Sequence, residues 1–481
     1  MLTVRNSFLL LVSLLLLLGV AWLQVAYRFE WGGVFMVLSG VALLLLFIPV
    51  SQLQLHADLR SRCVHVLSSL LRDPFFFALI GFLLLLVVQW LNAGLVSVYD
   101  YETERWGYSV PKWPSLPFAV NRSEAWEVLT WFVPAGVLTL LFRHSTRRRK
   151  WWSILMHAFM FNAVLLSMLG VAQLAKGTKS ILWKFPQTDG FFATFAYANH
   201  AGTFFMLTLS MALACLVPSK LRVPNRKQGI FYATVIVFSL LGCCFSQSRI
   251  SIAFAALLMV LAVGVYIRSL MKGLRLRRRA IFGLLKLTLV LSVLIPASAA
   301  VVMKFAGEDV KKEFRTMRLS NVTNDLSVRW VLVDAGFSAW KEHPWCGVGG
   351  WGFGYFWPLH SEPEHWQRAN QGKANAHNDP VQFLVEFGLV GAGLMGVMGG
   401  AMAWPAWRRW RGRRRAHRVG RYGVVSHPEI LVAGIVAVLL HSCIDLPFRN
   451  PAILFAWLFA VHLLIQPNSR SGRIESDHQN A

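Results

Sequence analysis

Long apolar runs constrain this chain more than any other feature of its sequence. Residues 8–27 read FLLLVSLLLLLGVAWLQVAY, and residues 75–95 read FFFALIGFLLLLVVQWLNAGL. Each run is about 20 residues long, which lets a helix cross a hydrocarbon layer about 30 Å thick. Only 15% of all residues are charged, against about 25% in soluble domains. The sequence therefore predicts an all-α polytopic membrane protein.

The hydropathy pattern predicts about twelve membrane-spanning helices. We expect the first to be retained, because its apolar stretch exceeds the roughly 7–15 residues of a signal peptide and no small-residue cleavage site follows it. The predicted helices cover residues 8–27, 33–50, 75–96, 125–142, 153–174, 199–217, 230–247, 251–269, 282–303, 381–402, 429–446 and 451–465.

The net charge of +25 is explained by topology rather than by nucleic-acid binding. Basic residues gather in alternate connections, with dense groups at 143–150, 268–279 and 408–421. Because cytoplasmic loops carry an excess of Lys and Arg, these groups and both termini are predicted to be cytoplasmic. The basic groups would also contact anionic lipids.

Four regions follow from this pattern. Residues 1–303 hold nine predicted helices, 304–380 form a large outer loop, 381–465 hold three helices, and 466–481 form a polar cytoplasmic tail. A loop of this length is uncommon unless it is functional.

Part of the outer loop is predicted to be a helix at residues 324–344. Its apolar residues recur at helical spacing, and Pro344 would end it. We expect this apolar face to lie on the membrane domain or in the headgroup layer. It consists of Leu326, Trp330, Val333, Phe337 and Trp340.

Cysteines and acidic residues give little indication of a metal site. The six cysteines form no pair of CxxC motifs, so neither a disulfide framework nor a zinc site is indicated. Asp100, Glu102 and Glu104 alternate in YDYETE, a pattern more typical of solvated acids than of metal ligands. We expect no metal and no other cofactor.

His377 stands just before a predicted helix N-terminus on the outer side. Asp379 is a plausible N-cap, and Pro380 suits the first helical position. A helix N-terminus favours an anion, and an imidazole there can act as a base. The alternative is a solvent-facing loop histidine.

Glu386 lies two turns inside the same apolar helix, on roughly the same side as Asp379. An ionisable group at membrane depth is costly and marks a candidate functional site. We expect Glu386 and Asp379 to hold His377 or the loop in place rather than to touch a substrate.

Two arginines on the outer side suit a diphosphate. Arg249 lies in the short turn SQSRIS, and Arg329 lies on the predicted outer helix. Guanidinium groups pair bidentately with phosphate oxygens, although each could instead be a headgroup anchor. Weaker candidates of the same kind are Lys179, Lys184, Arg315 and Arg318.

The stretch GVGGWG at 347–352 matches a dinucleotide-binding fingerprint by letter only. No strand–helix–strand unit surrounds it, so we exclude a nucleotide. The glycines are expected to let a tight loop pass close to other backbone.

Taken together, these motifs resemble the O-antigen ligase and O-antigen polymerase superfamily. They are SQSR ending at Arg249, RW starting at Arg329, HPWCGVGGWGFG starting at His343, and HNDPVQFLVEFGLVG starting at His377. TFAYANHAGTFFML is similar to the family's outer-face Asn before a helix, at Asn199.

This resemblance implies a GT-C-like fold and glycan transfer at the periplasmic face of the bacterial inner membrane. The implied donor is a polyprenyl-diphosphate-linked saccharide, and the acceptor is a hydroxyl of a glycolipid, glycan or protein. Metal and ATP would not be needed. His377, Arg249 and Arg329 are expected to act on the reacting groups. Asn378, Asn199, Lys184 and Arg318 are expected to bind substrate.

Two departures leave the acceptor open. Asn375 stands where many ligases carry a second histidine, and HSCIDLPFRNP at 441–451 is outside the family pattern used here. An O-antigen or exopolysaccharide polymerase and a protein O-oligosaccharyltransferase stay as alternatives within the class. A lipid or polysaccharide transporter and a metal-dependent glycosyltransferase using Asp100, Glu102 and Glu104 are alternatives outside it.

Overall fold

The computed structural model of this chain is dominated by helices. It describes residues 4–23, 32–47, 55–102, 104–144, 149–187, 190–219, 223–271, 319–368, 375–415 and 424–465. The helices are α1 (Val4–Leu14), α2 (Val20–Trp22), α4 (Gly32–Phe47), α5 (Leu55–Leu71), α6 (Pro74–Leu91), α7 (Arg122–His144), α8 (Arg149–Ala175), α9 (Ala198–Leu216), α10 (Arg226–Phe245), α11 (Arg249–Met271), α14 (Leu319–Glu342), α15 (Phe353–Phe356), α16 (Pro363–Arg368), α17 (Asp379–Arg415), α18 (Pro428–Ser442) and α19 (Pro451–Ile465). Shorter turns are the π-helical η1 (Leu15–Gly19) and the 3₁₀ turns η3 (Trp357–His360) and η5 (Pro447–Arg449).

The all-α polytopic class predicted from the sequence is confirmed. Within the described ranges, seven helices are long and apolar enough to cross a membrane, and four shorter helices are apolar. Together they coincide with eleven of the twelve predicted stretches. The remaining stretch, 282–303, lies outside the described residues, so the count of twelve stays a prediction.

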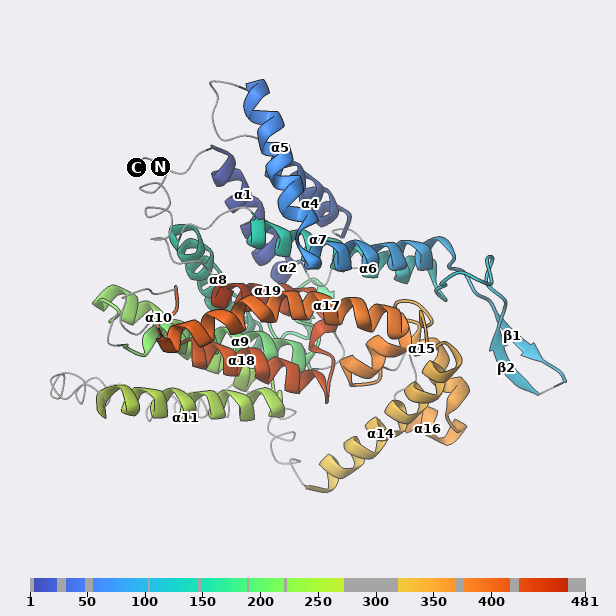
Figure 1. Ribbon diagram of the computed structural model, residues 1–481. Coiled ribbons are helices and arrows are strands. Elements are labelled where there is room, and N and C mark those ends of the chain that lie inside the picture. Colours follow the sequence, from blue (N-terminus) through green and yellow to red (C-terminus); the bar gives the residue numbers. More distant parts are fainter. Residues whose placement is uncertain are drawn as a thin grey trace.

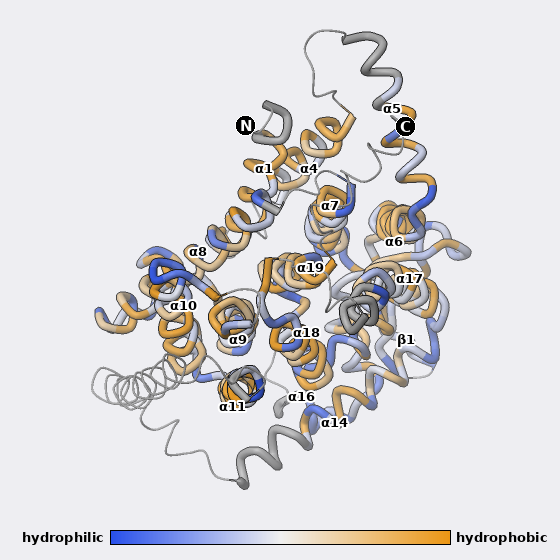
Figure 2. The backbone as a smooth tube through the Cα atoms, turned by 60° about the vertical axis from the view of Figure 1, so that its left-hand side comes forward, coloured by the Kyte–Doolittle hydropathy of each residue, from blue (hydrophilic) through white to orange (hydrophobic). Residues whose placement is uncertain are grey.

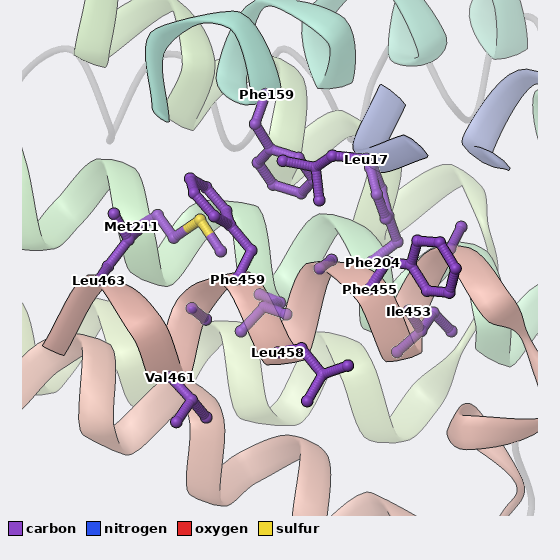
Figure 3. Close-up of a cluster of buried hydrophobic side chains, with 14 of the residues drawn as sticks. Leu17, Phe159, Phe204, Met211, Ile453, Phe455, Leu458, Phe459, Val461 and Leu463 are labelled. Atoms are coloured by element: carbon purple, nitrogen blue, oxygen red, sulfur yellow. The ribbon is translucent and has the colours of Figure 1, made fainter. Parts of the chain in front are cut away.

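Helix α9 forms the centre of the bundle. Every side chain from Ala201 to Cys215 is buried, as expected for a helix that is apolar on all sides. Phe204 of α9 lies 5.4 Å from Phe159 of α8, measured between ring centroids, and Phe159 lies 5.8 Å from Phe459 of α19. Figure 3 shows this cluster, with Met211 beside Phe459.

The connections on one side of the bundle carry the strands. Strands β1 (Ser97–Asp100) and β2 (Arg105–Tyr108) pair antiparallel after α6, and β3 (Ser180–Ile181) and β4 (Phe185–Pro186) pair antiparallel after α8. Figure 1 shows α14, α15 and α16 at the same end as β1 and β2. We call this end the hairpin side.

A second apolar core lies under the hairpin side. It joins Phe118 and Val120, before α7, to Phe353 and Phe356 of α15 and to the first turns of α17. Figure 2 shows hydrophobic residues dominating α6, α18 and α19, while hydrophilic residues concentrate along α14 and near β1. The described part of residues 304–380 is therefore partly helical and packs on the bundle.

The orientation of α14 bears on the two positions expected for its apolar face. Its buried residues are Leu332, Ala335 and Ala339. Two residues of the predicted apolar face point outward instead, with Trp330 70% exposed and Phe337 40% exposed. Small residues bring α14 close to its neighbours, whereas the aromatic rings face the surroundings, which agrees with the headgroup-layer alternative.

Helix α17 is interrupted at Gly388, where φ is +60° and ψ is −166°. The turn 344–349 supplies hydrogen-bond partners for the interrupted backbone. Leu389 N and Val390 N donate to the Pro344 and Trp345 carbonyls at 2.8 and 2.9 Å. Val348 N donates to the Val385 carbonyl at 3.0 Å. An irregular backbone inside a membrane protein requires such pairing.

The glycines of GVGGWG serve this pairing, as the sequence predicted. A Cβ atom at Gly347, where φ is +67°, would collide with the backbone of Glu386. The fingerprint-like spacing thus reflects close approach between two backbones.

An ionic cluster lies at the opposite end of the bundle. Asp73 caps the start of α6 and receives two hydrogen bonds from Arg143, at 2.7 and 2.6 Å. His144 Nε2 lies 3.0 Å from the same carboxylate. This cluster ties the start of α6 to the end of α7.

Candidate functional site

The turn Cys443–Asn450, between α18 and α19, collects polar groups from several helices on the hairpin side. Asp445 lies at its centre and is fully buried. Its carboxylate accepts hydrogen bonds from Leu446 N at 2.8 Å, from the Tyr197 hydroxyl at 3.0 Å and from Asn199 Nδ2. The segments that meet there are far apart in the sequence.

His377 contacts this carboxylate directly. Its Nδ1 lies 3.4 Å from Asp445 Oδ1, and its side chain is 33% exposed. The backbone of His377 has a φ of +46°, a conformation that few non-glycine residues adopt. The ring is therefore held at Nδ1 and is partly open to solvent.

Asn378, not Asp379, is the N-cap of α17. Asn378 Oδ1 accepts a hydrogen bond from Val381 N at 3.0 Å, and its Nδ2 donates to the Cys443 carbonyl at 2.8 Å. Asp379 instead accepts from Phe448 N at 2.9 Å. Both residue types cap helices well, and the contact with the turn Cys443–Asn450 decides between them.

Arg329 reaches the same turn from α14. Its Nη1 donates to the carbonyl of Ile444, the residue before Asp445. The packing thus places one guanidinium beside the carboxylate and the imidazole.

The electrostatics of Asp445 depend on these neighbours. Burial alone would raise the pKa of the Asp445 carboxyl, but the hydrogen bond with His377 and the charges of His377, His441 and Arg329 hold that pKa below its usual range. Conversely, burial and the charge of Asp445 raise the pKa of the Tyr197 hydroxyl. Asp445 is therefore an anion and Tyr197 a neutral hydrogen-bond donor.

Arg249 begins α11 immediately after a tight turn. Gln247 in that turn has a φ of +61°. The flanking Ser248 and Ser251 pack against Gly202 of α9, where a Cβ atom would lie 2.6 Å from Ser248 Cβ. Arg249 is thus held on the hairpin side near the start of α9, and none of the carboxylates in the described ranges forms an ion pair with it.

Glu386 forms a buried ion pair with Arg449 of η5. Gln382 Nε2 donates to Glu386 Oε1 at 3.0 Å, and the Arg449 guanidinium stacks 4.8 Å above the Trp351 ring. Glu386 lies two residues before the interruption at Gly388, so the pair fixes the interrupted helix against the turn Cys443–Asn450.

Other predicted site residues are not part of this cluster. Lys184 lies in the β3–β4 hairpin, with its ammonium 5.5 Å above the Phe185 ring. Arg318 lies outside the described residues. Asn375 accepts a hydrogen bond from Gln382 at 3.0 Å, so it supports the start of α17.

Tyr197, Asp445 and Arg449 were not predicted from the sequence. A signal for the last two was present, because a carboxylate and an arginine interrupt the last two apolar stretches at their outer ends. Tyr197 had no such signal, since an aromatic residue before a membrane helix is ordinary.

Among the residues that the structure describes, no group of three or more His, Cys, Asp or Glu side chains is arranged to hold a metal ion. In YDYETE, Asp100 Oδ1 accepts a hydrogen bond from Glu102 N at 2.9 Å.

The fold and the cluster define a class: a polytopic helical membrane protein with a polar site at the ends of its spanning helices. Residues 234–396 match the family model described as O-Antigen ligase. This match supports the resemblance to the O-antigen ligase superfamily. The matched region includes Arg249, Arg329 and His377, whereas Asn199 and Asp445 lie outside it. No curated protein matches the chain.

Proposed function

We propose that this protein transfers a glycan from a polyprenyl-diphosphate donor to an acceptor hydroxyl on the periplasmic face of a bacterial inner membrane. The observation that carries the proposal is the meeting of His377, Arg329 and Asn199 on the turn Cys443–Asn450. That turn lies at the end of apolar helices, where the diphosphate of a membrane-held donor would reach water.

The leaving group of this reaction is an anion. Breaking the bond between the anomeric carbon and the diphosphate oxygen leaves negative charge on the diphosphate. Guanidinium groups positioned where that charge grows would lower the barrier. We assign this role to Arg329, which contacts the turn Cys443–Asn450, and to Arg249 at the start of α11. Neither forms an ion pair with a carboxylate of the described residues.

In this proposal, His377 accepts the proton of the acceptor hydroxyl. Its side chain is partly exposed. The acceptor oxygen would then attack the anomeric carbon opposite to the diphosphate, which inverts that centre. Asn378 and Asn199 line the same turn and would bind sugar hydroxyls.

The orientation follows from charge and chain direction. The site lies on the hairpin side, whereas α17 runs from Asp379 at the site toward its Arg-rich end at Arg415. Because basic segments stay in the cytoplasm, the hairpin side would be periplasmic, and both termini would be cytoplasmic.

The test is transfer in proteoliposomes. Purified protein is incubated with a polyprenyl-diphosphate oligosaccharide, EDTA and three acceptors: a glycolipid, a glycan and a protein. We expect product on one acceptor despite EDTA, and its loss in His377→Ala, Arg249→Ala and Arg329→Ala. Lys341→Ala, which removes an exposed cation at the end of α14, is the matched control.

The acceptor that is used separates a ligase from a polymerase or a protein glycosyltransferase. Product that disappears with EDTA would contradict the metal-independent reaction. Uptake of lipid or polysaccharide without any transfer product would replace the proposal by a transporter, a class in which interrupted helices such as α17 also occur.

A further inference from the structure

We propose that Asp445 is a positioning residue of this site: its carboxylate fixes the ring of His377 so that Nε2 is presented to the acceptor hydroxyl. This inference rests on the proposed function, because it gives Asp445 a role in that reaction. Asp445 lies outside the region that matches the family model, and only the fold brings it to His377.

The Asp445 carboxylate is itself held in place. It is fully buried and holds donors from separate segments: Tyr197 and Asn199 at the start of α9, and Leu446 N in its own turn. A buried anion needs such donors, because it has lost its hydration. With its other lone pairs occupied, the carboxylate can meet His377 from one direction only.

The backbone around His377 is bound to the turn Cys443–Asn450 as well. Asn378 Nδ2 donates to the Cys443 carbonyl at 2.8 Å, and Asp379 N donates to the Asp445 carbonyl at 3.3 Å. These contacts hold His377 at its φ of +46°. Backbone strain of this kind persists where the surrounding structure imposes it, often at functional sites.

The consequence concerns the two ring nitrogens. An ionised carboxylate can only accept, so Nδ1 must be the protonated nitrogen that faces Asp445. Nε2 then carries the lone pair. In the reaction, Nε2 takes the acceptor proton while the new C–O bond forms and the C–O bond to the diphosphate breaks, with its electron pair leaving on the diphosphate. The proton then passes from the imidazolium to solvent.

The titratable and charged groups facing Asp445 come from every neighbouring element. They are His377 and Asp379 on α17, Arg329 on α14, Tyr197 and His200 at the start of α9, and His441 on α18. Because Asp445 is the carboxylate in contact with His377, replacing it changes the balance that holds a positive charge on His377 during the reaction.

The test compares Asp445→Asn with a matched control. Glu342 and His360 form a second carboxylate–imidazole contact, also at 3.4 Å, but Glu342 is 56% exposed. Steady-state transfer, with kcat and KM for the donor, is measured for Asp445→Asn and Glu342→Gln from about pH 5 to pH 9. We expect Asp445→Asn to lower kcat about 100-fold and to leave the donor KM within about twofold. Glu342→Gln should match the wild type in both values.

A double variant separates positioning from folding. Because Asp445 acts through His377, adding Asp445→Asn to His377→Ala should reduce the residual rate by less than about twofold. A residue that only supports the fold would reduce the rate by the same factor in both backgrounds. Should Asp445→Asn fail to fold, Tyr197→Phe removes one donor to the carboxylate without changing charge. We then expect kcat to fall roughly tenfold with an unchanged donor KM.

The outcomes distinguish the two proposals. If the wild type forms no product with any acceptor, the proposed function fails. If the wild type is active and His377→Ala is not, the inference is overturned by an Asp445→Asn enzyme with a wild-type kcat. The inference is also overturned if Asp445→Asn reduces the rate by the same factor in the His377→Ala background as in the wild type. A wild-type kcat for Tyr197→Phe overturns it as well.

Discussion

Replacing Gly388 by alanine tests how the site is built, because this residue carries the interruption of α17. Its φ of +60° and ψ of −166° fall in a region of backbone space that essentially only glycine occupies. An added Cβ atom would also lie 2.6 Å from the Cys346 backbone nitrogen and closer still to the Trp345 carbonyl oxygen. Both obstacles are backbone atoms, so no side-chain rotation relieves them.

The cost of Gly388→Ala follows from these two effects. The disfavoured backbone conformation costs about 1–3 kcal/mol, and crowding of a packed core costs about 1–3 kcal/mol more. Relief by separating the two segments would break the hydrogen bonds from Leu389 N and Val390 N to the 344–345 carbonyls, at about 1 kcal/mol each. We therefore expect a loss of roughly 3 kcal/mol or more.

Thermal unfolding in detergent, followed by the monodisperse fraction on size exclusion, measures this loss. Gly396→Ala is the control, since it lies on the same helix and a Cβ atom there meets nothing within 4 Å. Alanine raises helix propensity there by about 0.5–1 kcal/mol, so Gly396→Ala should keep or raise the Tm. Gly388→Ala should lower the Tm by roughly 5 °C. Equal melting of the two variants would refute the interrupted helix.

Three further predictions concern other parts of the structure. Glu386→Gln leaves the Arg449 guanidinium without its buried partner and should destabilise the protein by about 3–5 kcal/mol; an unchanged denaturation midpoint would contradict that pair. Burial raises the pKa of Asp73, but hydrogen bonds from its neighbouring histidine and arginine outweigh it and hold that pKa below the usual 3.8. The ionised Asp73 carboxylate therefore stabilises the fold above about pH 4, and this stabilisation is lost as the pH falls through the lowered pKa of Asp73. Asp73→Asn should thus lower the Tm at pH 7, and the difference from the wild type should shrink only in strong acid; a difference that vanishes already near pH 6 would be inconsistent with this. Finally, Cys443 is exposed on the hairpin side and Cys63 lies in α5. A membrane-impermeant maleimide should label Cys443 but not Cys63 in intact spheroplasts, and the reverse labelling would invert the proposed topology.

The apolar helices could be predicted closely from the sequence. Eleven of the twelve predicted stretches are helices. A lipid-facing or core helix must be apolar over its whole length, and this property can be read from each segment by itself. The close-approach role of the GVGGWG glycines was also predictable, since glycine is the residue that permits such contact.

The expectation that Asp379 caps α17 failed. Asn378, which precedes it, is an equally good type of cap, and its contact with the Cys443 carbonyl decides between the two. The apolar face of α14 was expected on the membrane domain or in the headgroup layer. Trp330 faces outward, because an apolar stripe in a membrane protein can face lipid as well as protein.

By itself, the sequence determined the membrane-spanning class, the order of the apolar helices and the motifs around Arg249, Arg329 and His377. Only the tertiary structure decided that Asp445 lies beside His377. The two residues are 68 positions apart in the chain, yet His377 Nδ1 lies 3.4 Å from Asp445 Oδ1. The reason is physical: hydropathy is a property of each segment, whereas a hydrogen bond between a carboxylate and an imidazole depends on how helices pack side by side, which no single segment specifies.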